Sequence, residues 1–143
     1  MKPTLEEKQT CLQSCGLFHD LSGDEMETLL KGSTVAGFSA AAIICSQGDP
    51  ASCAFIVMKG EAGIYIPDLA QPIHIMKGGD LFGEYGLFTG RRTAQVRALT
   101  DVVLIALDYR RLREHLFAHP QVMYDLLAVT VDRLQKTESF IKG

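Results

Sequence analysis

Residues 82–94 contain glycines, one carboxylate and two adjacent arginines, a set of groups suited to holding an anion. Gly83 lets the backbone approach a ligand closely, and Glu84 to Phe88 is expected to form one helical turn. The first amides of such a turn have no intrahelical partners and are free to donate to an anion. Arg91 or Arg92 then follows and would bring a guanidinium over the same position.

Glu84 needs a different role, because a carboxylate repels a phosphate. It is able to accept a hydrogen bond from a neutral hydroxyl nearby, so the group of residues fits a small ligand with one phosphate charge and one free hydroxyl. A purely structural interpretation is also open. Glu84 and Arg92 would then form a surface ion pair worth about 0–1 kcal/mol, and the glycines would be ordinary turn residues.

This stretch resembles the phosphate-binding cassette of cyclic nucleotide-binding domains, which has the pattern F-G-E-x-small-L, a short loop, then R-[S/T/A]-A. Phe82-Gly83-Glu84-Tyr85-Gly86-Leu87 is similar to the first part and Arg92-Thr93-Ala94 to the second. The resemblance covers nearly the whole chain and is closest to the sensor domain of the catabolite-activator (Crp/Fnr) family. That family's long-helix pattern is matched by His119-Pro120 and by Arg133-Leu134-Gln135-Lys136-Thr137.

The resemblance implies a regulatory ligand, a cyclic purine nucleotide such as cAMP or alternatively cGMP, and neither a cofactor nor catalysis. Glu84 would accept the ribose 2′-hydroxyl and would itself be braced by Arg133. Arg92 would hold the cyclic phosphate, with Arg91 as its rival because the loop before them is shorter than in most of the family. The backbone of Gly83 and the hydroxyl of Thr93 would add hydrogen bonds to the ligand. Thr137 would reach the base edge, and Ile73 and His74 would line the base pocket.

The resemblance also implies how a ligand signal would travel. The phosphate would draw the Glu84–Phe88 turn inward, and the C-terminal helices would reposition over the pocket around a hinge near His119-Pro120. Crp/Fnr proteins continue into a helix-turn-helix module, whereas this sequence stops after its long helix. We therefore expect either the sensor part of a transcription regulator or a stand-alone sensor that acts on a partner chain.

Three regions must position these residues, which we expect to form a single domain. Residues 1–32 are expected to form N-terminal helices, including one that starts at a Ser22–Glu25 capping box and stops near Gly32. Residues 33–107, with the cassette at 82–94, contain short β-rich runs separated by Gly and Pro turns. Such runs predict an antiparallel sandwich or barrel, and the resemblance specifies a double-stranded β-helix, or jelly roll. The predicted runs are Ser33–Phe38, Ala42–Cys45, Cys53–Met58, Gly63–Ile66, Ile73–Met76, Ala94–Ala98 and Val102–Leu107.

Residues 108–143 return to a helical pattern. Asp108 is a suitable N-cap for a helix over Tyr109–Ala118, and Pro120 suits the first turn of a second, longer helix. Apolar and small residues recur along this long helix with heptad spacing. They predict a homodimer seam that also packs on the barrel, with a surface helix that lies only on its own barrel as the alternative. The predicted seam residues are Met123, Leu127, Thr130, Leu134, Thr137 and Ile141.

Composition restricts the partners. The chain has 143 residues and a formal charge of −3, so it lacks the basic excess expected for direct contact with nucleic acid. All seven arginines follow Phe88, which places an anion site in the second half of the chain. No segment reaches the roughly 18 apolar residues needed to cross a membrane, and the N-terminus does not read as a signal peptide. Four cysteines are too few for a disulfide scaffold, so we expect a cytoplasmic protein.

Two alternatives of other classes remain at this point. Cys11, Cys15 and His19 share a helical spacing, and with Cys45 and Cys53 they are the candidates for a redox or metal sensor on the same fold. Iron–sulfur ligation usually needs tighter cysteine spacing than this, and buried cysteine more often acts as a small hydrophobe. The second alternative is a ligand-free structural interaction module. No catalytic motif is present, so we do not expect an enzyme.

Overall fold

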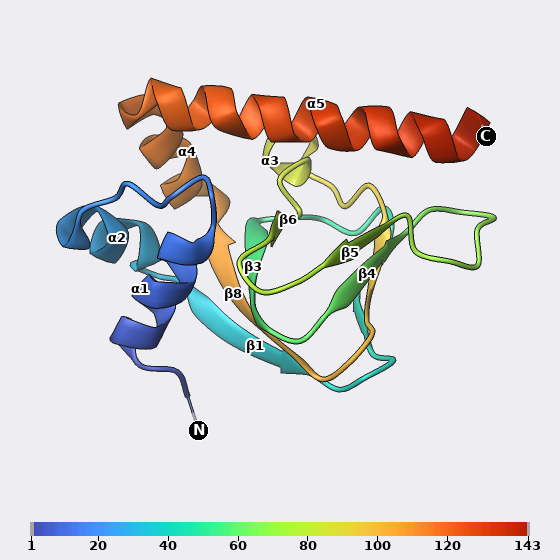
Figure 1. Cartoon of the computed structure of the whole chain (residues 1–143), viewed down its shortest axis with the longest axis horizontal. Helices are drawn as coiled ribbons and strands as arrows, with labels where there is room; N and C mark the ends of the chain where they lie inside the picture. The colour runs from blue at the N-terminus through green and yellow to red at the C-terminus, as the bar shows by residue number, and fades with distance from the viewer. Residues whose placement is uncertain (1, 143) are drawn as a thin grey trace.

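The computed structural model describes residues 2–142, in which helices lie beside and across a small β-barrel (Figure 1). The elements in chain order are α1 (Leu5–Ser14), α2 (Gly23–Leu30), β1 (Thr34–Phe38), β2 (Ile43–Cys45), β3 (Cys53–Lys59), β4 (Ala62–Tyr65), β5 (His74–Met76), β6 (Leu81–Phe82), α3 (Gly86–Thr89), β7 (Gln95–Ala98), β8 (Val102–Asp108), α4 (Tyr109–Ala118) and α5 (Pro120–Lys142).

The described strands form two four-stranded sheets, in the orders β1-β8-β3-β6 and β2-β7-β4-β5. The strand pairs in both sheets are antiparallel. Strands far apart in the sequence pair along their length, as β1 does with β8, which is the wrapped connectivity of a jelly roll. The predicted fold class is therefore confirmed: mainly β, with N-terminal helices and a long C-terminal helix.

Strands β3 and β8 are almost continuously apolar because both of their faces are buried. Alternate residues of a strand point to opposite sides. Val57 and Leu104 belong to the core inside the barrel, whereas Ile56 and Ile105 belong to the core beneath α1, α2 and α4. These two strands thus form a shared wall between the barrel interior and the helical layer.

Helix α2 has the termini that the sequence predicts. The Ser22 hydroxyl accepts from the Glu25 N–H at 3.1 Å, and the Glu25 carboxylate accepts from the Ser22 N–H at 3.0 Å. The helix ends at Leu30, and Gly32 follows with a left-handed φ of +77°. This helix packs against α1 and α4 and so fixes the side of the barrel where α4 turns into α5.

The C-terminal helices begin where predicted, although one expected capping hydrogen bond is missing. Tyr109 begins α4 and Pro120 begins α5. Asp108 occupies the predicted N-cap position of α4, but its side chain makes no capping hydrogen bond. The reason is that Asp108 is still the last residue of β8, paired with Cys53, and its backbone follows the strand rather than a free helix terminus.

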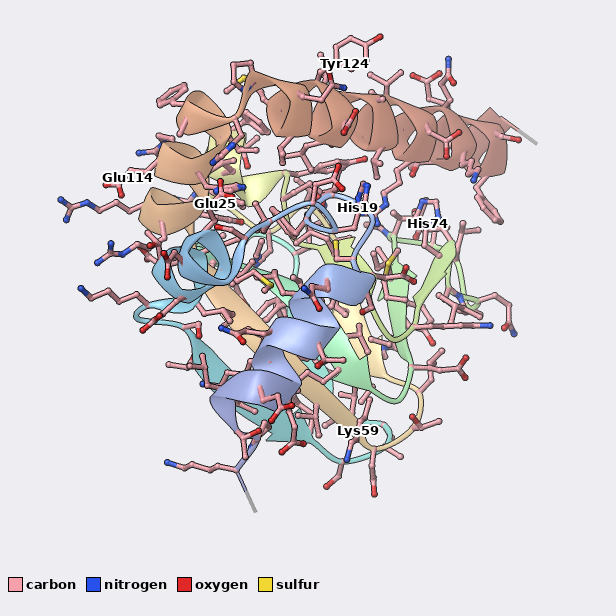
Figure 2. All side chains as sticks on the ribbon, turned by 60° about the vertical axis from the view of Figure 1, so that its left-hand side comes forward. His19, Glu25, Lys59, His74, Glu114 and Tyr124 are labelled. Carbon is pink, nitrogen blue, oxygen red and sulfur yellow. The ribbon has the colours of Figure 1, made fainter. Side chains whose placement is uncertain are left out.

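The predicted seam along α5 is only partly exposed. Thr130 and Thr137 are half-buried, and the Thr130 hydroxyl is buried without a hydrogen-bond partner. These two residues face the barrel, which agrees with a seam that also packs on the barrel, and the contact with a second copy stays a prediction. Figure 2 shows Tyr124 on the outward face of α5. The exposed apolar residues of this helix are Met123, Tyr124, Leu127, Val131, Leu134, Phe140 and Ile141.

The strand predictions agree with the structure to within one or two residues at each end, with one omission. Strand β6 was expected only as an approach to Gly83, but it pairs with β3. The expected turn at Glu84–Phe88 appears two residues later as α3. None of the described helices is long and apolar enough to cross a membrane.

Candidate ligand-binding cavity

A cavity opens at one end of the barrel, between the 82–94 segment and the inner side of α5, which crosses above α3 in Figure 1. It gathers residues from six separate segments of the chain. Of the eight predicted ligand residues, seven line it: Gly83, Glu84, Arg92, Thr93, Thr137, Ile73 and His74. Its apolar wall also includes Ile64, Ile66, Phe82 and Val96, and Arg133 and Cys45 lie beside its polar part.

Arg91 is the predicted residue that does not line the cavity. It is exposed, and its guanidinium donates to the carbonyl of Gly48 at 3.1 Å. Arg91 also forms a β-bridge with Pro50. In extended backbone, neighbouring side chains point to opposite sides, so this bridge turns Arg91 outward and Arg92 inward.

Arg92 is a buried cation, with only 8% of the residue exposed. Its guanidinium donates to the Gly83 carbonyl and the Tyr109 hydroxyl, each at 3.3 Å, and to the Cys53 sulfur at 3.5 Å. It also lies 5.0 Å from the centre of the Phe55 ring. No carboxylate in the described part of the chain forms an ion pair with it. A buried charge without a counter-charge is costly, so this cavity wall favours an anion.

Gly83 makes the approach of Arg92 possible. Its φ is +81°, a left-handed conformation that favours glycine. A Cβ atom at this position would lie 2.6 Å from Nη1 of Arg92, closer than two such atoms can pack. The absence of a side chain at Gly83 therefore leaves the space that the Arg92 guanidinium occupies.

Glu84 is the second buried charge, and it does have a partner. The residue is 2% exposed, and its Oε1 accepts from Nη1 of Arg133 at 2.9 Å. Arg133 lies on α5, so this ion pair joins the long helix to the cassette. The structure thus places Arg133 where the resemblance implied it, and it pairs Glu84 with Arg133 rather than with Arg92 in a surface ion pair.

His74 and Thr137 meet at the end of the cavity away from Arg92. His74 Nε2 lies 3.3 Å from the Thr137 hydroxyl, which itself donates to the Arg133 carbonyl at 2.9 Å. Burial lowers the pKa of His74, and the positive charges of Arg133 and Lys136 lower it further. A neutral His74 must therefore donate from Nε2, because the single proton of the Thr137 hydroxyl is already used.

Tyr109 is a part of the site that the sequence did not reveal. Its hydroxyl donates to the Gly83 carbonyl and accepts from Arg92. Burial raises the pKa of this phenol to about 12, so it remains a donor. Sequence analysis assigned Tyr109 only to the start of a helix. The available signal was that a tyrosine expected near the core needs a partner for its hydroxyl.

The cysteines do not form the alternative metal site. Cys15 is buried, and the Cys11 sulfur lies 3.5 Å from the Val57 carbonyl. His19 pairs with Asp20 at the surface. Among residues 2–142, no group of three or more His, Cys, Asp or Glu side chains is placed to hold a metal ion.

A jelly roll whose mouth holds an unpaired buried arginine and a buried glutamate defines a domain that binds a small anionic ligand. The sequence matches the family described as the cyclic nucleotide-binding domain over residues 36–119. The chain belongs to this family, as the cassette predicted.

Two curated relatives are transcriptional regulators that are longer than this chain. The chain is 26% identical over 132 residues to a CRP-like cAMP-activated global transcriptional regulator of Mycobacterium tuberculosis, covering 90% of this chain and 59% of that protein. It is 32% identical over 108 residues to the cAMP-activated global transcriptional regulator Vfr of Pseudomonas aeruginosa, covering 70% and 50%. The chain thus spans about half to three fifths of the length of these relatives.

A solved structure shares the fold over nearly its whole length. The sensor domain of the transcriptional regulator DNR from Pseudomonas aeruginosa superimposes with a TM-score of 0.78 at 24% identity. The match covers 94% of this chain and 93% of that one, so it includes the N-terminal helices and the long α5 as well as the barrel.

Proposed function

We propose that this chain binds a cyclic purine nucleotide, cAMP, and reports its presence through α5 as the sensor part of a transcription regulator. The observation that carries the proposal is the buried Arg92, which lines the cavity and has no carboxylate partner among the described residues. The relatives named above are cAMP-activated regulators, which supports the same ligand.

The balance of charge in the cavity suits a phosphodiester. Arg92 is one cation without a counter-charge, whereas Arg133 is already neutralised by Glu84 at 2.9 Å. A cyclic phosphate carries one negative charge and would therefore neutralise the positive charge of Arg92. A phosphate monoester with nearly two charges would bring the excess toward the Glu84 carboxylate, so 5′-AMP should bind much more weakly.

The hydroxyl of Thr137 supports adenine over guanine. Because its proton goes to the Arg133 carbonyl, its oxygen offers only a lone pair to a base. The 6-amino group of adenine donates a hydrogen bond, whereas guanine presents an acceptor oxygen at the same position. His74 keeps Thr137 in this state by donating to the same oxygen.

Ligand binding would be transmitted because one helix carries part of the pocket. Arg133 and Thr137 both lie on α5, and α5 begins at Pro120, directly after α4. A ligand that contacts the cassette and Thr137 together favours the state in which α5 lies over the cavity. His119-Pro120 is then the hinge, and α3 is the turn that the phosphate draws inward.

The exposed side of α5 provides the proposed dimer contact. Leu127, Val131 and Leu134 are each between 45% and 59% exposed, and a second copy of the chain would cover them. We propose a cytoplasmic homodimer whose output is made elsewhere, without catalysis or direct nucleic-acid contact by this chain.

Calorimetric titration of the purified chain with cAMP, cGMP and 5′-AMP tests the ligand assignment. We expect saturable binding of cAMP at one site per chain, weaker binding of cGMP and little binding of 5′-AMP. Tighter binding of cGMP would change the base assignment. Equal binding of 5′-AMP, or no binding of either cyclic nucleotide, would contradict the proposal.

A further inference from the structure

Three titratable side chains meet at the junction of α4 and α5, on the side of the molecule where α2 packs. His115 lies on α4, His119 ends that helix, and Glu25 comes from α2. His119 Nε2 lies 2.9 Å from a Glu25 carboxylate oxygen, and the two imidazole rings are 4.3 Å apart between centres. Figure 2 shows Glu25 between α2 and α4.

His115 is the buried member of this cluster. It is 9% exposed, and its Nε2 atom is buried without a hydrogen-bond partner. The rings of His115 and Phe18 pack edge to face, with 5.7 Å between their centres. Burial lowers the pKa of His115, the charge of His119 lowers it further, and Glu25 acts in the opposite direction.

Three carboxylates and one guanidinium line the depression that contains both histidines: Asp24 and Glu25 of α2, and Glu114 and Arg111 of α4. Among the described residues only Glu25 forms an ion pair with either ring, and it does so with His119 rather than with the buried His115. The first turn of α5 carries no charged residue. Its nearest charge along the chain is Asp125, which accepts from Gln121. Beside Phe18, His19 and Asp20 pair with each other.

We infer that His115 and His119 form a pH-sensitive latch that holds the α4–α5 junction against α2. The two imidazole rings are tilted by 35° to one another, and a positive charge on His119 would be neutralised by Glu25, 2.9 Å from its Nε2. A second proton would place a charge on buried His115, 4.3 Å from the first. Repulsion between the rings would then loosen the junction.

The latch is connected to the cavity through the backbone. The His119 N–H donates to the His115 carbonyl at 3.0 Å, and the Val122 N–H donates to the His119 carbonyl at 2.9 Å. A displacement of the rings therefore acts on the first turn of α5. The same helix carries Arg133 and Thr137 to the cavity. A loosened junction therefore lowers the fraction of molecules in which α5 lies over the cavity.

The direction of the pH effect follows from the lowered pKa of His115. A latched state that keeps His115 neutral binds fewer protons than a released state in which the ring is hydrated. The contribution of His115 to the latched state is therefore fully present well above pH 6.5 and is lost as the pH falls below that value. Each unit of difference between the two pKa values corresponds to a tenfold change in the latching equilibrium.

Hydrogen exchange in the ligand-free chain tests the latch directly. After correction for intrinsic rates, we expect the amides of residues 119–123 to lose protection between pH 7.5 and 5.5. His115→Phe keeps the ring but removes the titration, so its protection should stay constant. His19→Gln, a surface control, should behave like the wild type. An unchanged pH profile in His115→Phe, or constant protection in the wild type, would overturn the inference.

Two further measurements keep the test decisive if His115→Phe does not fold. The imidazole resonances of the wild type give the pKa of His115 directly, and a value at or above 6.5 would overturn the latch. Glu25→Gln removes the partner of His119, and the junction amides should then lose protection already at neutral pH. Unchanged protection in this variant would also contradict the inference.

The effect on the ligand rests on the proposed function and is measured separately. In a His74→Gln background, which removes the titrating histidine of the cavity, the affinity for cAMP should fall severalfold from pH 7.5 to 5.5. The fall should be absent when His115→Phe is added, and a fall that persists would overturn the latch. Loss of cAMP binding at every pH, with pH-dependent exchange intact, would refute the proposed function and leave the latch standing.

Discussion

Arg133 and Glu84 form an ion pair of 2.9 Å between the long helix α5 and the cassette turn. Their side chains are 17% and 3% exposed, so the pair is largely shielded from solvent. The same carboxylate is the one expected to accept the ribose hydroxyl. Under the proposed function, ligand recognition and the position of α5 would both depend on this single buried group.

Replacing Arg92 should have the largest effect on cAMP binding. Arg92→Ala removes the positive charge that would pair with the phosphate. Hydrogen bonds to charged groups are worth about 1.5–3 kcal/mol each. We expect at least a 10- to 100-fold weaker affinity by calorimetry. Arg91→Ala is the matched control, since its guanidinium contacts Gly48 outside the cavity, and it should change the affinity little. The reverse order would move the phosphate contact to Arg91.

Replacing Glu84 should separate the ribose contact from the effect on α5. Glu84→Ala leaves Arg133 without its partner, which weakens the binding of any ligand that needs α5 in place. Only cAMP loses an additional hydrogen bond, because 2′-deoxy-cAMP lacks the hydroxyl. The wild type should thus prefer cAMP over 2′-deoxy-cAMP, and the variant should bind both almost equally. A preference that survives in the variant would assign the hydroxyl to another residue.

Alanine variants of Gly83 and Gly90 separate two effects: the steric conflict of a new Cβ with Arg92, and the backbone strain of a positive φ. Both have positive φ values, +81° and +76°. A Cβ at Gly83 would lie 2.6 Å from Arg92, whereas one at Gly90 would meet no atom within 4 Å. Both alanine variants should lose about 1–2 kcal/mol of unfolding free energy. Only Gly83→Ala should also weaken cAMP binding by more than tenfold. Equal affinities in the two variants would show that the guanidinium does not depend on this glycine.

The sequence predicted those features of the site that depend on neighbouring residues. The Phe82–Leu87 pattern and Arg92 lie within one strand–turn–strand segment, so their approach to one another is encoded locally. The capping box at Ser22 and Glu25 is local in the same sense. Side chains alternate in direction along extended backbone, which explains why Arg92 points inward when Arg91 points outward. The bridge between Arg91 and Pro50 that fixes this direction was not foreseeable from the cassette alone.

The features that the sequence did not predict depend on contacts between distant segments. Tyr109 meets Gly83 only because β8 delivers the start of α4 to the cassette. Asp108 stands at the N-cap of α4 without a side-chain capping hydrogen bond, because β8 continues through it. The apolar spacing of α5 indicated a seam that also packs on the barrel, but the spacing alone did not show that Thr130 and Thr137 are the half-buried members of that seam.

Thr137 should determine the preference for the 6-amino group of the base. Thr137→Val keeps the shape of the side chain but removes the oxygen that accepts from His74 and from the ligand. We expect cAMP to bind roughly 10-fold more weakly, as for one lost hydrogen bond. Cyclic inosine monophosphate, which has an oxygen in place of the amino group, should bind weakly to the wild type and no worse to the variant. Thr137→Ser should retain the preference. Equal losses for both nucleotides would remove the proposed role.

A negative charge on the outward face of α5 should break the proposed dimer without unfolding the chain. Leu134 is 49% exposed, whereas Leu126 of the same helix is buried against the core. Leu134→Glu would place a carboxylate and its symmetry-related copy within an apolar contact, which is unfavourable unless each is paired. Ser139 is also exposed and lies about 140° further round the helix, so Ser139→Glu adds the same charge away from the contact. Sedimentation equilibrium should give a dimer for the wild type and Ser139→Glu and a monomer for Leu134→Glu, with similar melting temperatures. A monomeric wild type, or a dimeric Leu134→Glu, would mean that this face of α5 is not the contact between copies.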